Sequence, residues 1–208
     1  MLKFYSVGVK AHHFIVNLWD NVYDAGMMKP IFLIGYMGCG KTTLGQALAK
    51  VADVRFVDLD DWIEESQHAT VREIFANLGE DGFRQLERDA LREVARMERV
   101  VIACGGGTPC FFDNMEFMNA VGRTVWLDAS MERLMPRLII GKMKRPLLAK
   151  KSDDELERFV TDALNARREF YAKSQSVFNS DFLENQQEID STVRKFMERY
   201  SLPVKSHS

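Results

Sequence analysis

The chain has 208 residues, 46% of them hydrophobic and 28% charged, an ordinary globular composition that is sufficient for one domain with a sizeable core. Its 28 lysines and arginines against 30 aspartates and glutamates give a formal net charge of -2, which excludes the strongly basic footprint of a nucleic-acid-binding domain. No apolar run approaches the length of a membrane span, and three cysteines favour free thiols in a reducing compartment, so we expect a cytoplasmic protein without a nucleic-acid or membrane partner.

The first 27 residues differ from the rest of the chain. Segment 14–19 is apolar but short, and no small-residue cleavage site follows it, so a signal peptide is the weaker alternative. We expect residues 1–27 to form a weakly ordered extension, residues 28–202 to form one domain, and residues 203–208 to be a frayed tail. Met27 and Met28 are alternative starts just before the first predicted strand.

A glycine-rich motif follows the extension. Residues 35–42 read GYMGCGKT and fit the pattern G-x-x-x-x-G-K-[ST], between an apolar run at 31–34 and apolar residues at helical spacing in 43–50. Strand, glycine-rich turn and helix form the context that identifies a phosphate-binding loop, in which Lys41 reaches the β- and γ-phosphates and the Thr42 hydroxyl is a ligand of Mg²⁺. The expected phosphate-binding residues are Gly38, Cys39, Gly40, Lys41, Thr42 and Thr43.

Strands and helices alternate along the remaining chain. A capping box at Thr70 and Glu73 begins a helix that ends near Gly79, and Ser130 caps a helix that Pro136 breaks or kinks. Residues 139–152 are basic and irregular and predict a mobile loop. Further strands are expected at 55–57, 100–103, 124–127 and 177–179, and further helices at 61–67, 80–97, 113–120, 153–172 and 187–200. This order predicts an α/β fold with a five-stranded parallel sheet and helices on both faces.

Two aspartates follow the second predicted strand. If the strand is extended through Asp58 and Asp60, both side chains point to the same side. Beside a phosphate loop, such a pair suits water-mediated binding of Mg²⁺ and acceptance of a proton from an attacking hydroxyl; the alternative is a pair of solvated loop acids. Asp61 is expected to cap the next helix.

Arginines and a glycine triplet complete the candidate site. The planar forks of Arg84 and Arg167 suit a carboxylate, although each alone is more often a surface charge. The run Gly105, Gly106 and Gly107 allows a close backbone approach or simply forms a tight turn. Arg145, in the basic loop, is either a lid residue that folds onto the triphosphate or part of a solvated charge run.

Taken together, these motifs resemble the shikimate kinase family. The resemblance covers residues 28 to about 172 and implies the three-layer fold of P-loop nucleoside and nucleotide kinases with a mobile lid. It also implies ATP-dependent phosphorylation of the shikimate 3-hydroxyl, on the route to chorismate and the aromatic amino acids, by a monomer that uses Mg²⁺. The matching residues are 35–42, 58–60, Phe83, Arg84, Glu87, 105–107, 145–148, Arg167 and Tyr171.

The resemblance assigns roles within this set. Asp60 binds and deprotonates the acceptor hydroxyl, and Asp58 holds Mg²⁺ through water. Arg84 and Arg167 clamp the shikimate carboxylate beside the glycine triplet, and Arg145 is the lid arginine on ATP. Catalysis is thereby assigned to Asp60, Lys41 and Arg145.

The sequence also departs from the family pattern. Members often carry another lid arginine seven residues before the Arg-Pro pair, where this chain has Leu138 with Arg137 beside it. A late basic residue that contacts adenine is not evident at 182–187. Two other functions remain open: a kinase for a different hydroxy acid such as gluconate, and a nucleotide-binding regulatory module without catalysis.

Overall fold

The computed structural model describes residues 28–141 and 151–205. Its five strands form one parallel sheet in the order β2-β3-β1-β4-β5. The strands are β1 (Ile31–Ile34), β2 (Arg55–Asp58), β3 (Val100–Ala103), β4 (Arg123–Asp128) and β5 (Ser176–Asn179). The predicted five-stranded parallel sheet is confirmed, as is the position of residues 177–179 at a sheet edge.

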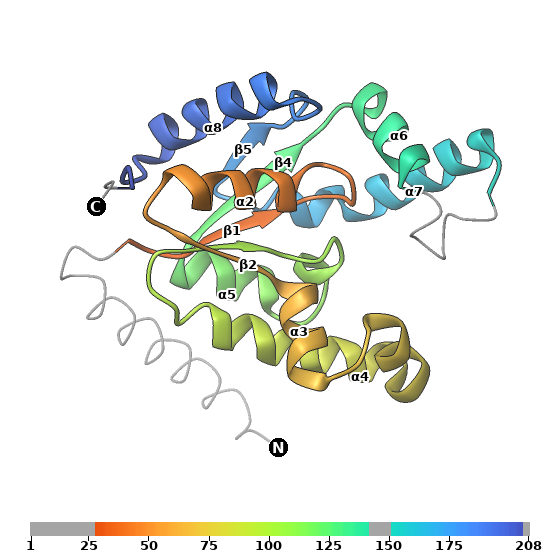
Figure 1. Cartoon of the computed structure of the whole chain (residues 1–208). Coiled ribbons are helices and arrows are strands. Elements are labelled where there is room, and N and C mark those ends of the chain that lie inside the picture. Colours follow the sequence, from red (N-terminus) through yellow and green to blue (C-terminus); the bar gives the residue numbers. More distant parts are fainter. Residues whose placement is uncertain (1–27, 142–150, 206–208) are drawn as a thin grey trace, which may run out of the picture.

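Helices cover both faces of this sheet. The α-helices are α2 (Lys41–Val51), α3 (Leu59–Gln67), α4 (Val71–Val94), α5 (Asn114–Val121), α6 (Met131–Ile140), α7 (Asp153–Tyr171) and α8 (Gln186–Tyr200), with a short 3₁₀ helix η1 (Thr108–Cys110). Helices α2 and α8 lie on one side of the sheet, and α4 and α5 lie on the other (Figure 1). Every residue of β1 and β3 is buried between these layers, as expected for central parallel strands.

Local sequence signals define several helix ends. The Thr70 hydroxyl accepts a hydrogen bond from the Glu73 N–H at 3.2 Å, while the Glu73 carboxylate accepts one from the Thr70 N–H at 2.8 Å, so the predicted capping box is confirmed. The predicted helix end near Gly79 is also confirmed, because Gly79 has φ 68° and ψ -175° and separates two helical segments within α4. None of the helices in 28–141 and 151–205 is both long and apolar enough to cross a membrane.

Two expectations about local structure are corrected. Helix α6 is not broken at Pro136 but continues to Ile140, since a proline removes only one backbone donor and the buried Leu134 and Leu138 hold the helix against the core on either side. The tail is paired rather than frayed over its described part: the N–H of Asp53 donates to Pro203 O and that of Lys205 to Val51 O, both at 2.9 Å. Residues 1–27, 142–150 and 206–208, and with them the predicted extension and Arg145, lie outside the described residues.

Candidate active site

The candidate site lies at the carboxyl ends of β1, β2 and β3. A cavity of about 640 Å³ opens there, and the phosphate loop, the start of α3 and the turn after β3 all contribute to its wall. The sequence-predicted residues that line it are Gly38, Gly40, Lys41, Thr42, Thr43, Asp58, Asp60, Gly105 and Gly106. Three separate segments therefore converge on one crevice, in agreement with the general position of ligand sites in such sheets.

The phosphate loop adopts backbone dihedral angles that its glycines make possible. Gly38 and Gly40 have φ values of 82° and 97°, in the left-handed region that disfavours other residues. Gly40 is the N-cap of α2 and forms no side-chain cap, so the first N–H groups of this helix are available to an anion. The Lys41 ammonium donates to the carbonyl oxygens of Gly35 and Tyr36, at 2.8 and 3.1 Å. The loop thus holds its lysine against its own backbone.

Asp58 joins the phosphate loop to α3. Its Oδ2 accepts a hydrogen bond from the Thr42 hydroxyl at 2.8 Å, and its Oδ1 accepts one from the Asp60 N–H at 3.2 Å. Asp58 is therefore the N-cap of α3, and the expectation that Asp61 would cap this helix is wrong. The predicted extended backbone through Asp60 is also wrong, because β2 ends at Asp58 and Asp60 lies in the first helical turn. Both carboxylates nevertheless line the cavity.

Asp60 lies in an electrostatically unfavourable place for a carboxylate. Burial, followed by the negative charges of Asp58 and Glu87, raises its pKa to about 6, while Lys41 acts in the opposite direction. A carboxyl group with this pKa is mostly ionised at neutral pH and still accepts a proton more readily than an ordinary aspartate. This combination suits a general base.

Arg84 is held by a buried carboxylate. Its Nη1 donates to Glu87 Oε2 at 2.8 Å, and its guanidinium lies 3.9 Å from the centre of the Phe111 ring. Glu87 is only 1% exposed and also accepts a 2.5 Å hydrogen bond from the Thr108 hydroxyl. The Arg84 Nε is buried without a hydrogen-bond partner among the described residues. Glu87 has no predicted role of its own, although its spacing of three from Arg84 on a helix is a signal for such a pair.

The glycine triplet brings three predicted acceptor-binding groups together. A Cβ at Gly105 would lie 3.2 Å from Asp60 Oδ1, one at Gly106 would lie 3.2 Å from Arg167 Nη1, and one at Gly107 would lie 2.8 Å from Arg84 Nη2. The run is packed closely by side chains of the protein, and its predicted role in binding the substrate stays a prediction. The turn is further fixed by Tyr171, whose hydroxyl donates to Gly106 O at 2.6 Å.

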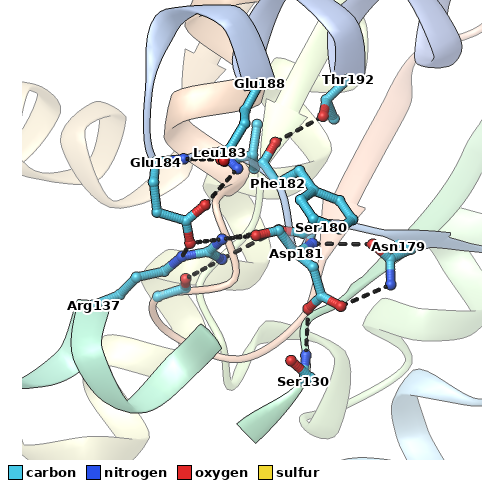
Figure 2. Close-up of polar contacts among 11 residues, drawn as sticks. Ser130, Arg137, Asn179, Ser180, Asp181, Phe182, Leu183, Glu184, Glu188 and Thr192 are labelled. Atoms are coloured by element: carbon cyan, nitrogen blue, oxygen red, sulfur yellow. Dashed lines mark hydrogen bonds and ion pairs between the residues drawn. The ribbon is translucent and has the colours of Figure 1, made fainter. Parts of the chain in front are cut away.

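Arg137 on α6 and Glu184 after β5 form a further polar pair in the cavity wall. Both line the cavity, and they pair with each other at 2.7 Å (Figure 2). From the sequence, Arg137 is known only as the neighbour of Leu138, and Glu184 has no predicted role. Helix periodicity alone cannot identify this pair, since its members are 47 residues apart.

Comparisons with known proteins agree with this geometry. The family model described as shikimate kinase matches residues 37–199. A shikimate kinase from Phocaeicola vulgatus is 54% identical over 166 residues, covering 80% of this chain and 95% of the relative. One from Bacteroides thetaiotaomicron is 53% identical over 175 residues, covering 84% of this chain and all of the relative.

Solved structures give the same result. A crystal structure of the Bacteroides thetaiotaomicron shikimate kinase has a TM-score of 0.81 at 52% identity and covers 85% of this chain and 99% of its own. The Acinetobacter baumannii shikimate kinase in complex with shikimate has a TM-score of 0.71 at 30% identity, covering 88% and 97%. The site geometry, the family model and these relatives together show that the chain belongs to the shikimate kinase family.

Proposed function

We propose that this protein transfers the γ-phosphoryl group of ATP to the 3-hydroxyl of shikimate, giving shikimate 3-phosphate and ADP. The observation that carries the proposal is the glycine triplet. Asp60, Arg167 and Arg84 each lie close to one of its three residues, and Gly105 and Gly106 line a cavity that the phosphate loop also lines. A base and two carboxylate-binding groups beside a triphosphate site suit a hydroxy acid as the acceptor.

The two arginines orient the acceptor. Arg84 and Arg167 lie over neighbouring glycines and come from different helices, α4 and α7, so they approach one carboxylate from two directions. Glu87 fixes the orientation of Arg84. When the two arginines bind the carboxylate of the acceptor at this turn, a ring hydroxyl of the acceptor lies beside Asp60.

Each residue of the site has its own role in phosphoryl transfer. The acceptor oxygen attacks the γ-phosphorus, the bond from this phosphorus to the β–γ bridging oxygen breaks, and Asp60 takes the hydroxyl proton. Lys41 leaves its carbonyl partners to contact the β- and γ-phosphates, and Arg145 adds positive charge from the lid. The phosphate loop contributes the N–H groups at the start of α2.

Mg²⁺ fits the residues at the Thr42–Asp58 contact. A hydroxyl and a carboxylate 2.8 Å apart, at the edge of the cavity, are oxygen ligands of the kind that this ion prefers. Mg²⁺ at kinase sites is held by one or two protein groups together with phosphates and water, and it neutralises phosphate charge. We assign Thr42 as a direct ligand and Asp58 as a ligand through water.

The test is ATP consumption by the purified protein with shikimate, with gluconate and without an acceptor. Consumption that depends on shikimate alone is the expected result. Consumption with gluconate would identify the other hydroxy-acid kinase, and ATP binding without consumption would identify a regulatory module.

Arg84→Lys separates the acceptor site from the nucleotide site. Lysine keeps the charge but loses the bidentate fork, so the Michaelis constant for shikimate should rise by about 10-fold or more while that for ATP stays nearly unchanged. Steady-state kinetics with each substrate varied in turn measures this split. An equal weakening of both substrates would place Arg84 at the phosphates instead.

The kinase domain is assigned to residues 28–202, and the protein is proposed to act as a cytoplasmic monomer. Of this chain, 84% matches an entire relative of known family. A chain that begins at Met28 should therefore keep its melting temperature and turnover within error. The full-length chain, measured in parallel, is the control, and a large loss of either property would show that residues 1–27 stabilise the domain.

A further inference from the structure

Three consecutive residues between η1 and α5 contact three arginines of α4. The pairs are Phe111 with Arg84, Phe112 with Arg88, and Asp113 with Arg92. Because these arginines are four residues apart, they lie on one face of the helix, one turn after another. Arg84 is the one of the three that lies against the glycine triplet, where a Cβ at Gly107 would be 2.8 Å from its Nη2. Residues 111–113 therefore follow one face of α4 as far as an arginine of the proposed acceptor site.

The Phe111 ring covers the guanidinium of Arg84. The centre of the guanidinium lies over this ring, 3.9 Å from the ring centre. Every other cation–π contact between residues that the structure describes is longer than this one. The Arg84 side chain is only 12% exposed, and a cation–π interaction is stronger at such a desolvated site than on an open surface.

Two carboxylates hold the edge of the same guanidinium. Nη1 of Arg84 donates to Glu87 Oε2 at 2.8 Å, and Nη2 donates to Glu80 Oε1 at 3.3 Å. These bonds locate the two nitrogens, whereas a ring against the face of the guanidinium also limits the tilt of its plane. The tilt matters because an arginine binds a carboxylate bidentately only when the carboxylate lies in the plane of the fork.

The Phe111 ring is carried by the turn that contains the glycine triplet. The carbonyl oxygen of Phe111 accepts a hydrogen bond from the Asn114 N–H at 3.3 Å. The fully buried Asn114 side chain donates through Nδ2 to Thr108 O at 3.0 Å, and the Thr108 hydroxyl donates to Glu87 at 2.5 Å. The support of the ring thus leads back to the carboxylate that binds Arg84.

We propose that Phe111 is a positioning residue for the acceptor: its ring sets the plane of the Arg84 guanidinium, so that the fork is already oriented when the acceptor carboxylate arrives. The inference rests on the proposed function, which assigns Arg84 to the acceptor. A preorganised fork needs no reordering on binding, so loss of the ring should weaken shikimate binding and spare ATP binding.

Phe111→Leu tests the ring itself. Leucine keeps an apolar side chain of similar size but has no π face, so the Michaelis constant for shikimate should rise by about 2- to 30-fold, the range expected for a lost cation–π contact. The turnover number and the Michaelis constant for ATP should stay within about 2-fold of the wild type, because only acceptor binding is affected. Phe111→Tyr keeps the ring and should keep the wild-type constants.

A double variant tests whether the ring acts through Arg84. Lysine has no planar fork to orient, so in the Arg84→Lys background Phe111→Leu should raise the Michaelis constant for shikimate by less than about 2-fold. If the two effects multiplied instead, Phe111 would act independently of Arg84, and the proposal would be overturned.

Phe112→Leu is the matched control. The Phe112 ring is 51% exposed and lies 5.1 Å from the guanidinium of Arg88, which has no assigned role at the acceptor. This variant removes a contact of the same kind and should leave the Michaelis constant for shikimate unchanged. An equal rise in Phe111→Leu and Phe112→Leu would show that the stacking on Arg84 is not the cause.

The measurements are steady-state kinetics with each substrate varied in turn and calorimetric titration with shikimate in the absence of nucleotide. An unchanged shikimate affinity in Phe111→Leu would overturn the proposal, as would an equal loss for ATP, which would indicate a general effect on the fold. Failure of the proposed function gives a different result. Wild-type protein that binds shikimate in a Phe111-dependent way without phosphorylating it would overturn the function alone, and wild-type protein that does not bind shikimate would overturn both.

Discussion

Asp60→Asn should lower shikimate-dependent phosphoryl transfer by at least about 10²-fold while ATP affinity is retained, because a positioned base contributes roughly 10²- to 10⁴-fold. The amide is nearly isosteric with the carboxyl group, but its nitrogen donates and neither end takes up a proton at neutral pH. In the wild type, turnover should fall as the pH drops through about 6, since protonated Asp60 cannot accept the acceptor proton. The variant should lose this acid limb from its pH profile.

The same substitution should stabilise the fold at neutral pH. The pKa of Asp60 is raised from 3.8 to about 6 on folding, so the folded state holds the extra proton between these pH values, and stability falls as the pH rises through that window. The cost at pH 7 is at most about 3 kcal/mol, from about 1.4 kcal/mol for each pH unit. Asp60→Asn removes this cost. Denaturant unfolding without ligands should show the gain at pH 7 and its disappearance below about pH 4.

Asp58→Asn is the control for the base assignment. Its carboxylate accepts from Thr42 and caps α3, so its loss should appear mainly as a raised Mg²⁺ requirement and lower stability. A Mg²⁺ titration of turnover compares the two variants. If extra Mg²⁺ restored Asp60→Asn but not Asp58→Asn, the two roles would be exchanged.

Lys41→Met should reduce turnover by about 10²- to 10³-fold, the loss typical for removing one preorganised group that stabilises developing charge. The Lys41 ammonium donates to two carbonyl oxygens of the loop, at 2.8 and 3.1 Å. It is therefore close enough to reach a phosphate group bound at the same loop. Methionine keeps the length of the side chain but has no charge and no N–H donor. Turnover at saturating shikimate, with ATP varied, is the measurement.

Lys50→Met is the matched control on the same helix. Lys50 is exposed in the last turn of α2, far from the phosphate loop, so its substitution should change neither turnover nor the ATP Michaelis constant. Equal losses in both variants would indicate a general effect of the substitution on α2. Full activity in Lys41→Met would show that another cation serves the phosphates.

Local sequence signals were sufficient to predict the phosphate loop, several helix ends and the parallel sheet of this protein. The phosphate loop could be recognised because its chemistry depends on backbone conformations that Gly38 and Gly40 provide within eight consecutive residues. The Thr70 capping box and the helix end at Gly79 were predictable for the same reason, since they depend on hydrogen bonds and dihedral angles within a few residues. Alternating strands and helices were sufficient to predict the parallel sheet.

Tertiary packing decided what depends on residues far apart in the chain. The Asp58 carboxylate is held beside the phosphate loop because it accepts a hydrogen bond from Thr42, 16 residues earlier. The described tail is ordered because Pro203 and Lys205 pair with the connection after α2. Arg137 has its charge neutralised because α6 packs against the segment after β5, which brings it to Glu184. Sequence spacing specifies none of these contacts, because each depends on how separate elements meet around a shared core.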